Sequence, residues 1–228
     1  MGEDMISVSS ILLAITAVSG IVDAVSFIAL GHVFTANMTG NVVFLGFAIG
    51  SVPGLSIWRS LLALVFFMSG ALLGGWMTKA MNPQDPGSMP VHALVMETVL
   101  LLAASVVSIG FRAPYEDHKL KIALVIALTA VVMGLRNAVV RKLGVPDLTT
   151  TVLTLTIAGF AADSSLAGGN NPRWGRRAAS VLAMLTGAIA GTSMLAYSVA
   201  IPLFACGVLT AICALARLHL SRKELSNG

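Results

Sequence analysis

Apolar residues in this chain come in runs of roughly 20, the length that a helix needs to cross a hydrocarbon core about 30 Å thick. The runs hold few charges, so each predicts a transmembrane helix. The predicted spans are residues 8–30, 58–79, 92–111, 119–140, 177–197 and 199–218. The pattern therefore predicts an all-α polytopic membrane protein that forms a single membrane domain over 1–228.

Two further apolar segments, 35–50 and 149–163, are each only about 15 residues long and are rich in Thr, Asn or Gly. Such segments either cross fully or form broken, re-entrant helices. Each follows a break that starts with glycine, GHVF at 31–34 and GVPD at 144–147, and Pro146 cannot continue a helix. We therefore expect six spans with two short re-entrant helices, or eight spans.

Composition agrees with this membrane class. Hydrophobic residues make up 57% of the chain and charged residues only 11%, whereas a soluble domain carries about 25% charged residues. The N-terminus, MGEDMISVSS, is acidic and lacks the basic region of a signal peptide, so the first apolar run is predicted to stay as a helix. The pI near 9.4 does not indicate nucleic-acid binding, because the basic residues lie at loops and helix ends.

The placement of Lys and Arg predicts that both termini are cytoplasmic. With six spans, four basic residues lie on the side away from the termini, namely Arg59, Arg112, Lys119 and Lys121. The ten on the termini side are Lys79, Arg136, Arg141, Lys142, Arg173, Arg176, Arg177, Arg217, Arg222 and Lys223. The termini side also receives ten if there are eight spans.

The sequence predicts an internal repeat, with one copy at about 8–111 and the second at about 119–218. Four matches occur in the same order: GIVDAV (20–25) with GLRNAV (134–139), Thr35 and Thr39 with Thr150 and Thr154, GFA (46–48) with GFA (159–161), and SGALLG (69–74) with TGAIAG (186–191). If the short segments are re-entrant, each copy crosses three times and the repeats are inverted; if they cross fully, the repeats are parallel. Their marginal length favours the inverted arrangement.

Four residues stand out as candidates for substrate binding or coupling because they place charge or amide groups inside predicted spans. They are Asp23, its repeat counterpart Asn137, the neighbouring Arg136, and Glu97. Ionisable groups within spans are costly and often mark a pathway or a proton relay. Asp23 could instead make a buried structural hydrogen bond. Arg136 could pair with Asp23, contact a substrate, or reach the membrane interface from a helix end.

Neutral hydrogen-bonding groups cluster in the two short segments. Asn37, Thr39 and Asn41 lie in the first, and Thr150 and Thr154 lie in the second. Threonine hydroxyls often bond only to carbonyls of their own helix. That explanation suits scattered threonines better than two clusters that follow breaks at matching positions of a repeat.

Small residues form two faces, Gly70–Ala71–Gly74 and Gly187–Ala188–Gly191, here called the Gly-Ala faces. Such faces allow helices to approach closely, either between the two halves or in a homodimer. The four histidines are dispersed, Cys206 and Cys213 share one face of the last predicted helix, and no metal, disulfide or cofactor site is predicted. Because neither a nucleophile with its base nor a phosphate-binding loop is evident, we do not expect an enzyme.

Three motifs carry a resemblance to a known family: D-A-V-S-F at 23–27, G-x-x-F-x-x-N-M-T-G-N at 31–41, and M-G-x-x-N-A at 133–138 followed by T-T-x-x-x-T. With these motifs the chain resembles the YoaK-like family of bacterial integral membrane proteins, whose domain is one of unknown function. The resemblance covers nearly the whole chain. It implies a bacterial inner-membrane protein of about six spans and supplies no substrate.

Breaks at matching positions of a repeat are typical of secondary transporters, whose sites lie near the midplane where broken helices expose free backbone groups. We therefore predict a transporter of an unknown small solute, which Asp23 or Glu97 could couple to protons. Paired helix N-termini would suit an anionic or polar solute. The alternatives are a channel or passive pore lined by the same groups, and a structural or assembly protein that does not transport.

Overall fold

The computed structural model describes residues 2–79, 90–111, 118–144 and 153–226, and this part of the chain is helical without any strand. The elements, in order, are α1 (Gly2–Ala29), α2 (Met38–Ile49), α3 (Ile57–Met77), α4 (Val91–Val107), α5 (Lys119–Leu143), α6 (Leu153–Ala162), the short 3-10 helix η4 (Ser165–Ala167), α7 (Trp174–Leu195) and α8 (Ala200–Ser226). Each of the six predicted spans corresponds to one of the longer helices.

Five of these helices, α1, α3, α5, α7 and α8, are long and apolar enough to cross a membrane. Helices α2 and α6 have 12 and 10 residues. At 1.5 Å per residue they are about 18 and 15 Å long, well short of a hydrocarbon core of about 30 Å. The chain is a polytopic helical membrane protein, and its two polar-rich segments form short helices, as their sequence predicted.

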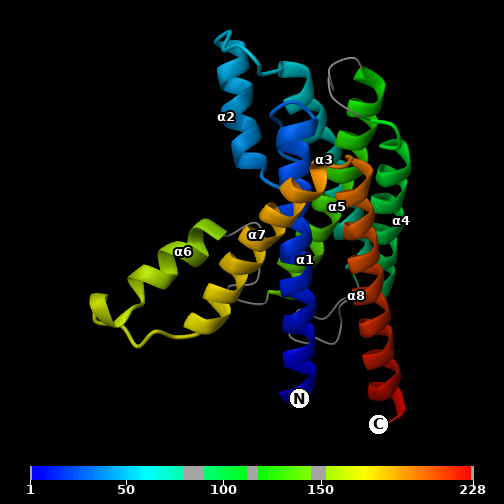
Figure 1. Cartoon of the computed structure of the whole chain (residues 1–228). Coiled ribbons are helices and arrows are strands. Elements are labelled where there is room, and N and C mark those ends of the chain that lie inside the picture. Colours follow the sequence, from blue (N-terminus) through cyan, green and yellow to red (C-terminus); the bar gives the residue numbers. More distant parts are fainter. Residues whose placement is uncertain (1, 80–89, 112–117, 145–152, 227–228) are drawn as a thin grey trace.

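Helix α1 runs through the centre of the bundle, with α5, α4 and α8 on one side and the two short helices on the other (Figure 1). The start of α1 and the end of α8 lie at the same end of the molecule (Figure 1). Helix α2 lies beside the far end of α1, whereas α6 and the first part of α7 project sideways from the bundle (Figure 1). The short helices thus approach the bundle at different heights.

The Gly-Ala faces pack within the chain. A Cβ atom at Gly70 would lie 2.1 Å from the carbonyl oxygen of Val131 on α5, and one at Gly187 would lie 2.1 Å from the carbonyl oxygen of Ala17 on α1. Glycine is therefore needed for α3 to reach α5 and for α7 to reach α1. These glycines pack between the two halves of the chain, which is one of the two uses expected for them, and a homodimer through the same faces stays a prediction.

The core lies where α1, α4, α5 and α8 meet. Leu12, Leu94 and Leu135 are completely buried there, and Cys213 of α8, which is 4% exposed, lies in the same cluster. The outer surfaces of α3 and α7 carry exposed apolar side chains, as lipid-facing helices do. Leu72, for example, is 76% exposed. Polar side chains inside this bundle therefore need a specific explanation.

Candidate functional site

The first helix break turns the chain back toward the middle of α1. Gly31 and His32 follow α1 with φ angles of 87° and 56°, a left-handed turn that ends the helix. Further on, the buried Asn41 side chain holds Phe34 by both backbone groups: its Oδ1 accepts from the Phe34 N–H (2.9 Å) and its Nδ2 donates to the Phe34 carbonyl. Asn41, a predicted site residue, therefore fixes the shape of the break.

Two predicted site residues hold the start of α2. Asn37 is its N-cap, and the Asn37 side chain accepts a hydrogen bond from the Gly40 N–H at 3.4 Å. Asp23 of α1 accepts a hydrogen bond from the Ala36 N–H through Oδ1 at 3.2 Å, and only 8% of Asp23 is exposed. The carboxylate of Asp23 thus stands at the beginning of α2, where it faces the positive end of the helix dipole.

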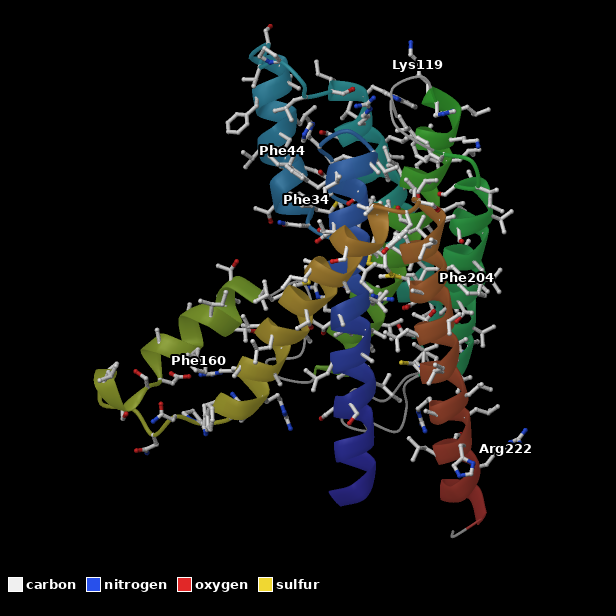
Figure 2. The ribbon with its side chains drawn as sticks, in the orientation of Figure 1. Phe34, Phe44, Lys119, Phe160, Phe204 and Arg222 are labelled. Carbon is white, nitrogen blue, oxygen red and sulfur yellow. The ribbon has the colours of Figure 1, made fainter. Side chains whose placement is uncertain are left out.

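Aromatic rings fasten α2 to α1. Phe34 stacks on Phe27 of α1 with ring centroids 5.3 Å apart, and on Phe44 of α2 with centroids 5.6 Å apart. Figure 2 shows Phe34 and Phe44 together between the two helices. Stacked rings add to the stability that their burial provides. The first short helix is therefore held firmly at its starting end.

The second short helix is tied to α7 by Arg177. The Arg177 guanidinium donates to the carbonyl of Gly159 and pairs with the carboxylate of Asp163 at 2.8 Å. Both partners lie at the end of α6, and Arg177 itself is only 5% exposed. The beginning of α6 is thereby left to face the bundle.

A cavity of about 300 Å³ lies between the first turns of the two short helices and the middle of α1. The described residues that line it are Ser19, Asp23, Ala36, Asn37, Met38, Thr39, Phe67, Leu153, Thr154, Ile157 and Met184. Its volume is at the lower end of the range for small-molecule sites, about 300–1,000 Å³. Four predicted site residues, Asp23, Asn37, Thr39 and Thr154, therefore meet at one place.

The threonines of this cavity differ from most others in the chain. Thr16, Thr129 and Thr192 each bond to the carbonyl four residues earlier in their own helix. The hydroxyls of Thr39 and Thr154, the second residues of α2 and α6, make no hydrogen bond to any residue within the described ranges. A residue in the first turn has no helical carbonyl one turn before it. Their hydroxyls are thus available to a solute.

Arg136 and Glu97 form a buried ion pair beside the cavity, not in its lining. Two guanidinium nitrogens of Arg136, Nε and Nη2, donate to Oε2 of Glu97 at 3.0 and 2.7 Å. Nη1 donates to the Ile15 carbonyl at 2.8 Å and to the Ser19 hydroxyl at 3.1 Å. Arg136 therefore neither pairs with Asp23 nor reaches the interface, because Glu97 holds it inside the bundle with no exposed surface. Because Arg136 is buried within the bundle, it no longer counts among the ten basic residues assigned to the termini side.

Asn137 is not among the described residues that line the cavity. Asn137, the counterpart of Asp23, donates to the carbonyl of Met133 in its own helix at 2.8 Å. Thr150 lies outside the described residues. Among the residues that are described, no three His, Cys, Asp or Glu side chains are grouped as a metal site.

Sequence reasoning missed Ser19, Phe67 and Met184 as lining residues. Ser19 lies one helical turn before Asp23, so the helical period could have identified it. Phe67 and Met184 are separated by 117 residues, the same offset as the two Gly-Ala faces. The repeat could therefore have paired them, although apolar residues give no signal of their own.

Comparison with known proteins gives a family and a relative. The family model described as "Protein of unknown function (DUF1275)" matches residues 11–216. The chain is 39% identical over 155 residues to the UPF0700 transmembrane protein YoaK of Bacillus subtilis (strain 168). This alignment covers 68% of the chain and 65% of the relative, so the chain spans just under two thirds of that protein's length. No solved structure matches the chain.

Proposed function

Because the chain belongs to the DUF1275 family, as its YoaK-like motifs indicated, and is a multi-pass membrane protein, we propose that it transports a small polar solute through the cavity between α2 and α6. One observation carries the proposal: the first turns of both short helices and the buried carboxylate of Asp23 line a single cavity. Broken helices that meet in this way form the substrate sites of many secondary transporters.

The proposed transporter crosses the membrane six times and is built from inverted repeats. The contacts of the Gly-Ala faces support this, since the two halves exchange equivalent partners: Gly70 meets Val131, and Gly187 meets Ala17. The glycines are offset by 117 residues and their partners by 114, both close to the repeat spacing. The shortness of α2 and α6 supports the same arrangement, because three crossings per half invert the second copy.

We also propose that the protein resides in the bacterial inner membrane with both termini in the cytoplasm. The excess of basic residues on the termini side supports this orientation. The start of α1 and the end of α8 lie at one end of the molecule, as an even number of crossings requires (Figure 1).

In this proposal a solute bonds to the hydroxyls of Thr39 and Thr154, and Asp23 supplies the charge that couples transport to protons. Glu97 is less suited to coupling because Arg136 already occupies its carboxylate.

Flux measurements test the proposal. Purified protein in liposomes is given a panel of small polar solutes with and without an imposed pH gradient. Saturable uptake that depends on the gradient supports coupled transport, flux that grows linearly with driving force indicates a pore, and no flux across the panel indicates a protein that does not transport.

Asp23→Asn should remove the dependence on the pH gradient while the protein still inserts and folds. The amide oxygen of asparagine can still accept the hydrogen bond from Ala36, so the start of α2 keeps its partner. Thr192→Val is the matched control, because Thr192 bonds only within α7 and lies on its exposed side. Unchanged gradient dependence in Asp23→Asn would show that Asp23 is not the coupling residue.

A further inference from the structure

Given the proposed transport function, we infer that the solute carries a small positively charged hydrogen-bond donor, an ammonium or guanidinium group, which binds to Asp23 and Ser19 of α1. This inference names the chemical class of the solute for the cavity described above. It follows from the hydrogen-bonding capacity that the lining side chains have left after their own contacts are counted.

Asp23 brings a carboxylate to the cavity without a counter-charge. It is 8% exposed, and within the described residues no Lys, Arg or His lies in salt-bridge contact with it. Its bond to the Ala36 N–H provides a neutral donor only. A buried charge is costly unless it is paired. A cation in the cavity would supply the missing partner.

Ser19 can offer such a cation only an acceptor. Its hydroxyl donates to the Ile15 carbonyl at 3.1 Å, and Nη1 of Arg136 donates to the same hydroxyl oxygen at 3.1 Å. A serine hydroxyl has one proton and two lone pairs, so one lone pair remains. Asp23 lies four residues later on the same face of α1. This wall of the cavity therefore presents acceptors to a solute.

On the α2 side of the cavity, an anionic solute, which the paired helix N-termini had suggested, meets backbone N–H groups that the chain's own oxygens already occupy. At the first break the N–H groups of Phe34, Ala36 and Gly40 donate to the side chains of Asn41, Asp23 and Asn37. The described lining residues include no Lys, Arg or His. An anion would thus lie beside the Asp23 carboxylate, and the neighbouring Arg136, which bonds to Ser19 from outside the lining, is already paired with Glu97.

The rest of the lining limits the size and shape of the solute. Met38, Phe67, Leu153, Ile157 and Met184 form an apolar wall to the cavity. A volume of about 300 Å³ admits only a small molecule. The solute class that fits is a short alkyl chain or similar apolar body with one cationic head.

Equilibrium binding tests this inference directly. The thermal unfolding midpoint of the purified protein in detergent is measured against propylammonium, guanidinium, propionate and propanol. The two cations should raise the midpoint in a saturable way, and propionate and propanol should not. Stabilisation by propionate alone, or none by either cation, overturns the inference.

Variants separate a cation site from a general effect of salt. Asp23→Asn should abolish the cation-dependent shift and Asp23→Glu, which keeps the charge, should retain part of it. Ser19→Ala should weaken cation binding about tenfold or more, as expected for the loss of a hydrogen bond to a charged group. Ser69→Ala, whose hydroxyl bonds only within α3, is the matched control. A cation shift that survives in Asp23→Asn contradicts the inference.

Uptake of the same probes into liposomes distinguishes this inference from the proposed function. If propionate is taken up saturably and propylammonium is not, transport stands and the solute class is wrong. If propylammonium binds with the expected dependence on Asp23 but never crosses the membrane, the solute class stands and the transport function is wrong.

Discussion

Replacing Glu97 by glutamine should strongly destabilise the folded protein. The Arg136 guanidinium has no exposed surface, and two of its nitrogens donate hydrogen bonds to the Glu97 carboxylate at 3.0 and 2.7 Å. The change removes this carboxylate and leaves the guanidinium without a counter-charge. Loss of one partner from a buried ion pair costs about 3–5 kcal/mol, because the remaining charge stays desolvated. The bonds of Arg136 to Ile15 and Ser19 remain but supply no negative charge.

A double-mutant cycle measures this effect. Glu97→Gln, Arg136→Met and the double variant are unfolded by adding SDS to mixed micelles, and the loss of helical circular dichroism gives each free energy of unfolding. The double variant should lose clearly less than the sum of the two single losses, since removing both charges leaves no unpaired ion. Ser69→Ala, an exposed control, should change stability by less than about 0.5 kcal/mol. The reasoning fails if Glu97→Gln costs under about 1 kcal/mol or if the losses are additive.

Two further predictions concern helix packing and topology. Gly74→Ala should lower the free energy of unfolding by about 1–3 kcal/mol, because the new Cβ would lie 2.6 Å from the Leu135 carbonyl oxygen. Gly75→Ala, with no atom within 4 Å of the new Cβ, should be neutral or stabilising by up to about 1 kcal/mol. The same SDS titration compares the two variants, and equal losses of stability would contradict the close packing. Cysteines introduced at Ser51 and Asn171 should react with a membrane-impermeant maleimide from opposite sides of the membrane. Both native cysteines are buried, and if the chain crosses six times in total, the three crossings of α3, α4 and α5 separate these two loops. Labelling from the same side would indicate eight crossings.

Much of the fold could be predicted because membrane helices have a strong sequence signal. The predicted span 58–79 corresponds to α3 (Ile57–Met77), and the short segment 35–50 corresponds to α2 (Met38–Ile49). Length alone distinguished the long helices from the short ones. The polar cavity residues Asp23 and Thr39 were identifiable for a related reason: polar groups are rare inside apolar runs, so each one needs an explanation.

The partners of those polar residues could not be predicted. The sequence shows how far along its helix Arg136 lies. Which neighbouring helix its side chain faces depends on the packing of the whole bundle. Asp23 was a candidate partner for Arg136 because it matches the neighbouring Asn137 in the predicted repeat. The actual partner is Glu97 of the adjacent helix α4. Ser19 was overlooked because serines are common in this chain and hydroxyls often bond within their own helix, as its bond to Ile15 also does.

The Glu97–Arg136 ion pair also bears on how the chain enters the membrane. Helix α5 carries an arginine that costs about 2.5–3.5 kcal/mol at the centre of an isolated inserted helix, and α4 has only 17 residues with a buried acidic group. Helix α4 is therefore a poorer candidate for insertion alone than α5, which is long and apolar, and a hairpin of the two neutralises both charges. We therefore expect α4 and α5 to leave the insertion machinery together, so that the end of the first half and the beginning of the second are joined during synthesis, before α7 and α8 have been made.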